Sequence, residues 1–184
     1  LGGSGEQDPE CDNVLEVTYR DFTEAHPDFE MQFRGDVVRL TLVQPNLGAD
    51  GKPEFRSSVG CQWDQQARNR CSNNTPPTQI VITSKDSFDQ WYRTIAGTNM
   101  EVKGTLTLDE PTPDRYVYDS TAFFPLEGQG MGPSPMNGDN PERKNYLFTT
   151  QIHVSFTYQA GQQFSFRGDD DLWIFVNRRL ALDV

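Results

Sequence analysis

Alternating apolar and polar positions run through much of the chain and predict short β-strands. We expect strands at 14–19, 36–43, 79–82, 100–108, 116–118, 145–158, 172–176 and 179–184. Phe164 and Phe166 repeat the alternation after a turn at 160–161. The stretch 172–176 is apolar on both faces, which predicts a position inside a sheet.

One segment, 85–96, has the periodicity of a helix. Ser84 precedes it as an N-cap and Gly97 follows it as a stop. Because its apolar residues recur at helical spacing, we expect one face of this helix to pack on the strands. That face consists of Phe88, Trp91, Tyr92 and Ile95.

Many antiparallel strands and one helix indicate a mainly β fold, either a sandwich or a barrel. Residues 1–13 are expected to form a flexible tether, 14–184 one domain, and 125–144 a long surface loop within it. The strand at 179–184 leaves its hairpin without a polar tail. Since that would leave an open sheet edge, we expect residues beyond Val184 to complete the sheet.

The turn Asn177-Arg178 joins the last two predicted strands. A two-residue type I′ turn needs positive φ at both positions, and arginine is a poor occupant of that region. The sequence therefore predicts a hairpin with a wider connection.

The amino-acid composition is informative mainly through the net charge of the chain. The 184 residues include 16 Lys and Arg against 27 Asp and Glu, a formal net charge of -11. Such a chain is repelled by nucleic acid and by anionic membranes, so neither is an expected partner. No apolar run approaches the roughly 20 residues of a membrane-spanning helix, and we expect no transmembrane segment.

Three cysteines raise the question of a disulfide or a metal site. Cys61 and Cys71 lie in a polar stretch without a CxxC pair, and both histidines are distant in sequence, which disfavours zinc. A local disulfide between Cys61 and Cys71 is favoured over two free thiols. Cys11 is then either free or paired outside this chain.

The strongest chemical signal is the run Gly168-Asp169-Asp170-Asp171 between two predicted strands. Three adjacent carboxylates repel one another, so the run needs a cation, nearby arginines or full solvation. Consecutive Asp side chains bind one Ca²⁺ together only if the backbone is distorted, as by a cis peptide. The alternative is a solvated acidic turn with Arg167 as its counter-ion.

The run FSFRGDDDLWIFVNRRLALDV (164–184) resembles the signature of the fibro-slime domain, a branch of the protective-antigen-type carbohydrate-binding fold. Further similarity lies in VTYRDFTEAHPDFE, ITSKDSFDQWYRTIAGTNM, YDSTAFFPLEGQGMG and NYLFTTQIHVSFTY, so it covers most of 14–184. The resemblance implies a secreted or cell-surface antiparallel β-sandwich of jelly-roll type. In sugar-binding relatives such as the yeast flocculins, two consecutive aspartates hold Ca²⁺, and that pair corresponds to Asp169 and Asp170.

Two functions follow as hypotheses. The first is a calcium-dependent carbohydrate-binding module for adhesion, with Asp169 and Asp170 contacting both the metal and the sugar. Trp63, in a polar setting, is a further candidate sugar contact, whereas Trp91 and Trp173 are expected to pack in the core. The second is a structural surface or matrix subunit that contacts other such proteins. No catalytic motif is present, so an enzyme is not expected.

Overall fold

The computed structural model describes residues 13–29, 39–64, 70–71, 80–132, 142–168 and 171–184. Within these residues the chain is mainly β, with ten strands and one short helix. The elements are β1 Val14–Phe22, β2 Arg39–Leu40, β3 Cys61–Asp64, β4 Arg70–Cys71, α1 Lys85–Asp89, β5 Asn99–Thr107, β6 Asp109–Thr112, β7 Arg115–Val117, β8 Phe148–Ile152, β9 Trp173–Val176 and β10 Arg179–Asp183.

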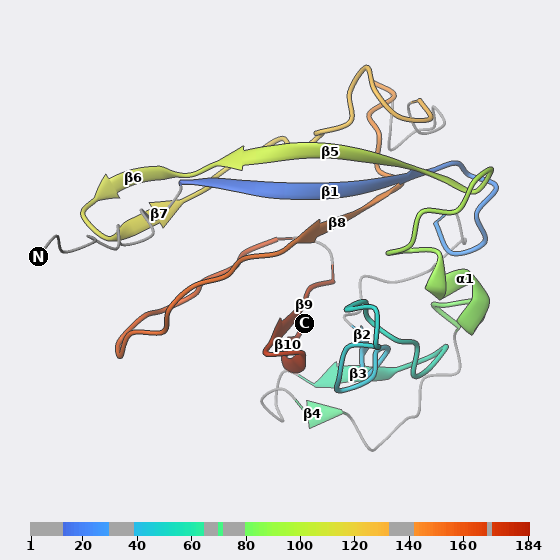
Figure 1. Cartoon of the computed structure of the whole chain (residues 1–184). Helices are drawn as coiled ribbons and strands as arrows, with labels where there is room; N and C mark the ends of the chain where they lie inside the picture. The colour runs from blue at the N-terminus through green and yellow to red at the C-terminus, as the bar shows by residue number, and fades with distance from the viewer. Residues whose placement is uncertain (1–12, 30–38, 65–69, 72–79, 133–141, 169–170) are drawn as a thin grey trace, which may run out of the picture.

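The largest sheet is an antiparallel three-stranded sheet in the order β5-β1-β8 (Figure 1). Its central strand, VLEVTYRDF, is rich in the β-branched and aromatic residues that favour strands. Alternation places Val17 and Tyr19 on one face of β1 and Thr18 and Arg20 on the other. This sheet therefore separates an aromatic face from a polar face.

Three smaller antiparallel sheets complete the described strands. They are β10-β9, β2-β3-β4 and β6-β7. The predicted mainly β class is thus confirmed. Strand β9 was expected in a sheet interior, but it lies in a two-stranded sheet and most of its side chains are half-buried.

The core is divided between two clusters of buried side chains. One lies beside α1 and contains Leu42, Val43, Ile82 and Phe88. The other lies on the aromatic face of β1 and contains Val17, Tyr19 and Leu126. Trp91 and Trp173 pack against the first cluster, as predicted for both.

The predicted helix is much shorter than expected. Ser84 caps it as predicted, with a reciprocal capping box to Ser87, but α1 ends at Asp89. Beyond it, the amide side chain of Asn99 accepts from the Ile95 backbone N–H and donates to the carbonyls of Gln90 and Arg93. These bonds hold 90–96 as a series of turns, because a side chain replaces the helical backbone partners.

The prediction of a buried apolar face on 85–96 is confirmed at three positions and wrong at the fourth. Phe88 is fully buried, and Trp91 and Tyr92 pack beside it. Ile95 is 39% exposed, because the turns after Asp89 no longer keep it on the helix face.

The prediction of a wide β9–β10 hairpin is wrong. Val176 pairs with Arg179 across a two-residue turn, and Asn177 and Arg178 have φ values of 49° and 69°. This is the type I′ pattern. Arg178 is held there by its neighbours: its carbonyl accepts from Leu47 N at 2.9 Å and its guanidinium donates to the Gly48 carbonyl.

Other strand limits also differ from prediction. Residues 80–82 form no strand; the N–H groups of Val81 and Ile82 donate to the Ser58 carbonyl instead. Strand β2 ends where Thr41 adopts a φ of 65°. Asn13 was assigned to the tether, yet its side chain and its carbonyl bond the backbone of Leu108.

The long strand predicted at 145–158 is limited to β8, Phe148–Ile152. Residues 153–168 run away from the sheet and return without entering any strand (Figure 1). Apolar and polar residues do alternate in this stretch, but within the described residues no neighbouring strand pairs with it. The apolar side chains of this stretch are consequently exposed: Ile152, Val154, Phe156, Tyr158, Phe164 and Phe166.

Candidate functional site

The predicted metal pair, Asp169 and Asp170, lies outside the described residues. The same holds for the peptide bond between them, on which the cis prediction rests. Among the described residues there is no cis peptide and no group of three or more His, Cys, Asp or Glu placed to hold a metal. The calcium site therefore stays a prediction.

The hairpin that follows the acidic run is firmly anchored. Trp173 Nε1 donates to Asp183 Oδ1 at 3.0 Å, across the β9–β10 pair. The second oxygen of Asp183 accepts from the Thr41 N–H at 2.8 Å. One half-buried carboxylate thus joins β9, β10 and the residue after β2.

Trp173 has a structural role in this anchor. Its ring lies 6.2 Å from that of Trp91 in a stacked arrangement and 6.0 Å from that of Phe88. Trp91 in turn donates from Nε1 to Asp28 Oδ2 at 2.9 Å. Both tryptophans are half-buried and are engaged in packing and in hydrogen bonds, as expected for core residues.

Tyr92 connects the end of the acidic run with the polar face of the large sheet. Burial raises the pKa of the Tyr92 hydroxyl, and the charge of Asp171 raises the pKa further, while Arg20 lowers it. Because these are charge effects at one oxygen, both Asp171 and Arg20 lie within electrostatic range of it. Asp171 is the described end of the acidic run.

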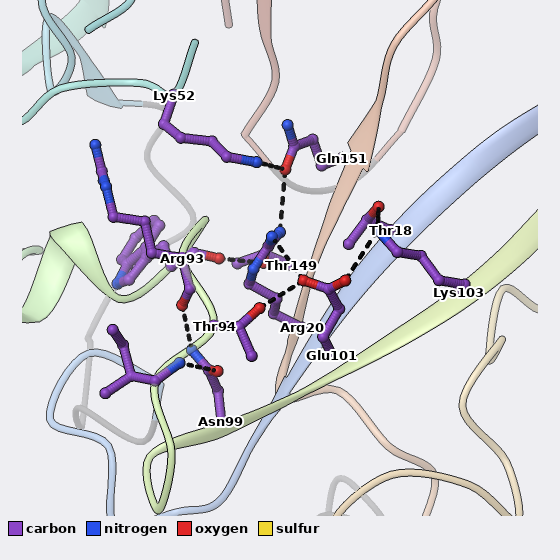
Figure 2. Close-up of polar contacts among 12 residues, drawn as sticks. Thr18, Arg20, Lys52, Arg93, Thr94, Asn99, Glu101, Lys103, Thr149 and Gln151 are labelled. Atoms are coloured by element: carbon purple, nitrogen blue, oxygen red, sulfur yellow. Dashed lines mark hydrogen bonds and ion pairs between the residues drawn. The ribbon is translucent and has the colours of Figure 1, made fainter. Parts of the chain in front are cut away.

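A network of polar side chains covers that face, which we call the Arg20 cluster (Figure 2). Its members are Thr18, Arg20, Lys52, Thr94, Glu101, Lys103 and Gln151. The register brings most of them together: Arg20 pairs with Glu101 on β5, and Thr18 pairs with Lys103 on β5 and Gln151 on β8. Cross-strand partners share a face, so the sheet itself builds the cluster.

Glu101 is the carboxylate of this cluster. It accepts from Arg20 Nη2 at 3.1 Å, from Lys103 Nζ at 2.9 Å and from the Thr94 hydroxyl. The hydrogen bond from Thr94, together with that from Lys103, lowers the pKa of Glu101 to about 2. Glu101 is therefore ionised at every pH at which the protein is expected to function.

Two cations of the cluster share one neutral acceptor. Arg20 Nη1 and Lys52 Nζ donate to the same Gln151 Oε1, at 3.0 Å and 2.7 Å. Burial lowers the pKa of Lys52, and the nearby charge of Arg20 lowers the pKa further. Three cations and one carboxylate leave the Arg20 cluster with a surplus of two positive charges, in a chain whose net charge is -11.

The remaining predicted site residues are only partly described. Trp63 lies on β3, and its backbone pairs with Cys71 of β4, but its side chain falls outside the described part. Cys61 is disulfide-bonded. Its pairing with Cys71 stays a prediction, because the side chain of Cys71 is likewise not described. Arg167, the expected counter-ion of the acidic turn, lies 3.7 Å from Asp119 with both side chains largely exposed.

The Arg20 cluster is the feature that sequence reasoning missed. The alternation of β1 already places Thr18 and Arg20 on one face. Their partners come from positions near 52, 101 and 151, and only the strand register brings these together. Arg20 lies just beyond the strand predicted at 14–19, whereas β1 extends to Phe22, so the prediction left Arg20 out of the sheet.

The chain is similar to several proteins of Dictyostelium discoideum. It is 33% identical to protein psiD over 176 residues, which is 93% of this chain and 32% of psiD. It is 35% identical to protein psiC over 163 residues, 86% of this chain and 29% of psiC, and 28% identical to protein psiJ over 186 residues, 94% of this chain and 24% of psiJ. The chain thus spans about a third or less of these relatives.

No family model matches the chain, and no solved structure matches it. The printed names of the relatives state no ligand or activity. The fibro-slime resemblance therefore remains a prediction. In the described residues, no helix is long and apolar enough to cross a membrane.

Proposed function

We propose that this chain is an extracellular, calcium-dependent carbohydrate-binding module that serves adhesion or surface recognition. Asp169 and Asp170 would hold the ion, and the bound ion would supply coordination sites for sugar hydroxyls. The observation that carries the proposal is the acidic run itself, three carboxylates at the entrance to β9. Carboxylate oxygens are the hard donors that Ca²⁺ prefers, so the donor set fits the metal.

Two features support this proposal. The Asp183 anchor holds the hairpin after the run in one position, which a metal site built at its entrance requires. A disulfide-bonded Cys61 agrees with a secreted or cell-surface location, since disulfides persist in oxidising compartments. We further infer that the small antiparallel sheets belong to a jelly-roll-like sandwich.

Labelled protein on a glycan array, with Ca²⁺ or with a chelator, tests the proposal. We expect binding of some glycans that the chelator abolishes and that the Asp170→Asn variant lacks. Asp109→Asn, an exposed aspartate on β6, is the matched control and should bind normally. Glycan binding that survives the chelator and Asp170→Asn would contradict the calcium-dependent mechanism.

The second candidate, a structural surface or matrix subunit, is favoured by the exposed stretch 152–166. No Asp, Glu, Lys or Arg occurs between Lys144 and Arg167, yet Phe156 is 64% exposed and Tyr158 73%. Exposed strand edges in soluble proteins normally carry charges that prevent association. An uncharged apolar surface of this kind is typical of a segment that another polypeptide covers.

Analytical ultracentrifugation distinguishes this candidate. A structural subunit should associate with increasing concentration, and Phe156→Lys should prevent the association. Ile80→Lys is the control, because Ile80 is also exposed but lies outside the stretch. A monomer at all concentrations, together with calcium-dependent glycan binding, would leave only the first candidate.

A further inference from the structure

A pocket of about 420 Å³ opens on the face of the large sheet opposite the Arg20 cluster. It lies between β5 and the segment 118–129, and its volume is within the ordinary range of small-molecule sites. Four aromatic side chains contribute to its walls: Tyr19, Tyr118, Phe123 and Phe124. Neither the predicted metal pair nor the Arg20 cluster contributes to it.

The aromatic rings differ in how much of them is accessible. Tyr19 is only 3% exposed and lies 6.3 Å from Phe123, ring to ring, at the base. Tyr118 packs edge-on against Phe123 at 6.0 Å but is 44% exposed. Tyr118 is thus a positioned aromatic ring that a ligand can reach.

Gly104 allows the ring of Tyr19 to pack closely against β5 beside the pocket. It pairs with Val17, and its neighbour along β5, Val102, pairs with Tyr19, so Gly104 lies diagonally beside that tyrosine. A Cβ at Gly104 would lie 2.9 Å from Tyr19 Cε2. Since the backbone of Gly104 is not in the left-handed region, the close approach to Tyr19 is what requires glycine here.

The lining carries no Asp, Glu, Lys or Arg, in a chain of which 23% of residues are charged. Its side-chain polar groups are the hydroxyls of Tyr19, Tyr118 and Thr105 and the amide of Gln129. Burial raises the pKa of the Tyr19 hydroxyl, and Tyr118 raises it further, so this hydroxyl stays protonated and neutral. Such a pocket favours a neutral ligand that has both an apolar face and hydroxyl groups.

We propose that this pocket binds a neutral saccharide ring, whose C–H face stacks on Tyr118 while its hydroxyls bond Gln129. The saccharide class rests on the proposed function, but the site itself needs no calcium, because no carboxylate lines it. Because no charged side chain lines the pocket, an acidic sugar would find no ion-pair partner there. We therefore expect the pocket to prefer a neutral sugar.

Saturation-transfer NMR and calorimetry with glucose, galactose, mannose and N-acetylglucosamine, all in the presence of a chelator, test the proposal. We expect at least one of the four to bind. Tyr118→Ala should weaken its affinity by about tenfold, the worth of one aromatic contact. Tyr118→Phe keeps the ring and should retain most of the affinity.

Gly104→Ala tests the wall that Tyr19 forms, because the added Cβ would lie 2.9 Å from Tyr19 Cε2 and must shift that ring. Its binding should fall while its melting temperature shows that the sheet remains folded. Tyr158→Ala removes a tyrosine that is 73% exposed and outside the pocket, and should bind like wild type. Equal affinity of Tyr118→Ala and wild type, or binding of none of the four sugars, would overturn the proposal.

The chelator and Asp170→Asn separate this inference from the calcium proposal. Binding that survives both and is lost in Tyr118→Ala supports the pocket, whatever the fate of the metal site. Binding that the chelator abolishes would overturn the pocket as the sugar site and would favour the calcium site.

Discussion

Arg20 is a buried cation whose bonding depends on the strands on either side of it. It is 4% exposed, and burial lowers the pKa of its guanidinium while Glu101 raises it. A buried arginine needs partners for its charge, and the two Nη atoms of Arg20 donate to Glu101 on β5 and Gln151 on β8, although its buried Nε has no hydrogen-bond partner. The residue thus stabilises the β5-β1-β8 register as well as the polar face.

Glu101→Gln should make this dependence measurable as a function of pH. The folded-state pKa of Glu101, about 2, lies below the ordinary value of 4.5, so ionised Glu101 stabilises the fold above pH 4.5. That contribution is lost as the pH falls from about 4.5 to 2. We expect the variant to lose about 1–2 kcal/mol of unfolding free energy at pH 7, after allowance for a partly exposed carboxylate.

Urea denaturation at several pH values measures this difference. Wild type and Glu101→Gln should converge as the pH approaches 2. Glu16→Gln, an exposed position on the same strand face as Arg20, is the control and should change the unfolding free energy little. A constant difference at all pH values would show that the ionised carboxylate is not responsible.

Trp91 combines ring packing with a side-chain hydrogen bond beside α1. Its ring meets those of Phe29, Phe88 and Trp173, and its indole N–H is bonded to Asp28. Trp91→Ala should therefore destabilise the protein by about 3–5 kcal/mol in a denaturation experiment. Tyr158→Ala, which removes an exposed aromatic side chain, is the control. If Trp91→Ala lowered the unfolding free energy only as much as Tyr158→Ala does, a packing role for Trp91 would be contradicted.

At the scale of elements, a strand predicted from alternation forms only where a segment distant in sequence pairs with it. Strand β1 was predicted to begin at 14, as it does, because its alternation coincides with two neighbouring strands that pair along it. The same kind of alternation at 153–158 forms no strand, since within the described residues nothing pairs there. Periodicity reports that a segment can form a strand, but the partner determines whether it does.

Hydrogen bonds from side chains to the backbone explain why the predictions for α1 and for the last hairpin were wrong. The helical pattern of 85–96 contains nothing that shows the Asn99 side chain taking the backbone bonds after Asp89. Arg178 adopts positive φ because carbonyls near Gly48 bind its guanidinium, a contact between positions 130 apart in sequence. For the site, the acidic run was visible in sequence, whereas the Arg20 cluster required the strand register.

The short strands β3 and β4 depend on a disulfide in our interpretation. They make a two-residue pairing, Trp63 with Cys71 and Asp64 with Arg70, which is too small to be stable alone. We predict that Cys61 is joined to Cys71. Mass spectrometry of a non-reduced digest should show that linked peptide; Cys61 linked to Cys11 instead would contradict the pairing.

For the whole molecule, the distribution of charge matters more than its sum. The chain is strongly acidic, yet the Arg20 cluster carries two surplus positive charges and lies within electrostatic range of Tyr92, as does Asp171. This surplus favours the ionised carboxylates of the acidic run and opposes a bound cation. Where Asp169 and Asp170 hold Ca²⁺ as proposed, we expect this surplus to weaken the binding of the ion.

Lys52→Gln should consequently raise calcium affinity by about two- to fivefold, the effect of one unit charge acting partly through water. Lys85→Gln removes a lysine that is paired with Asp89 at the surface and serves as the control. Calorimetric titration compares the two variants with wild type. Equal increases in both would show only an effect of net charge.

The central claim is that Asp169 and Asp170 bind Ca²⁺ together. Calorimetric titration of Ca²⁺ into wild type, Asp170→Asn and the Asp109→Asn control tests it most directly. Because the substitution keeps the size of the side chain and removes one charged ligand, we predict that affinity falls by about tenfold or more in Asp170→Asn, while the control is unchanged and all three remain folded. Equal calcium affinity in wild type and Asp170→Asn would show that the acidic run is a solvated turn and would contradict the claim.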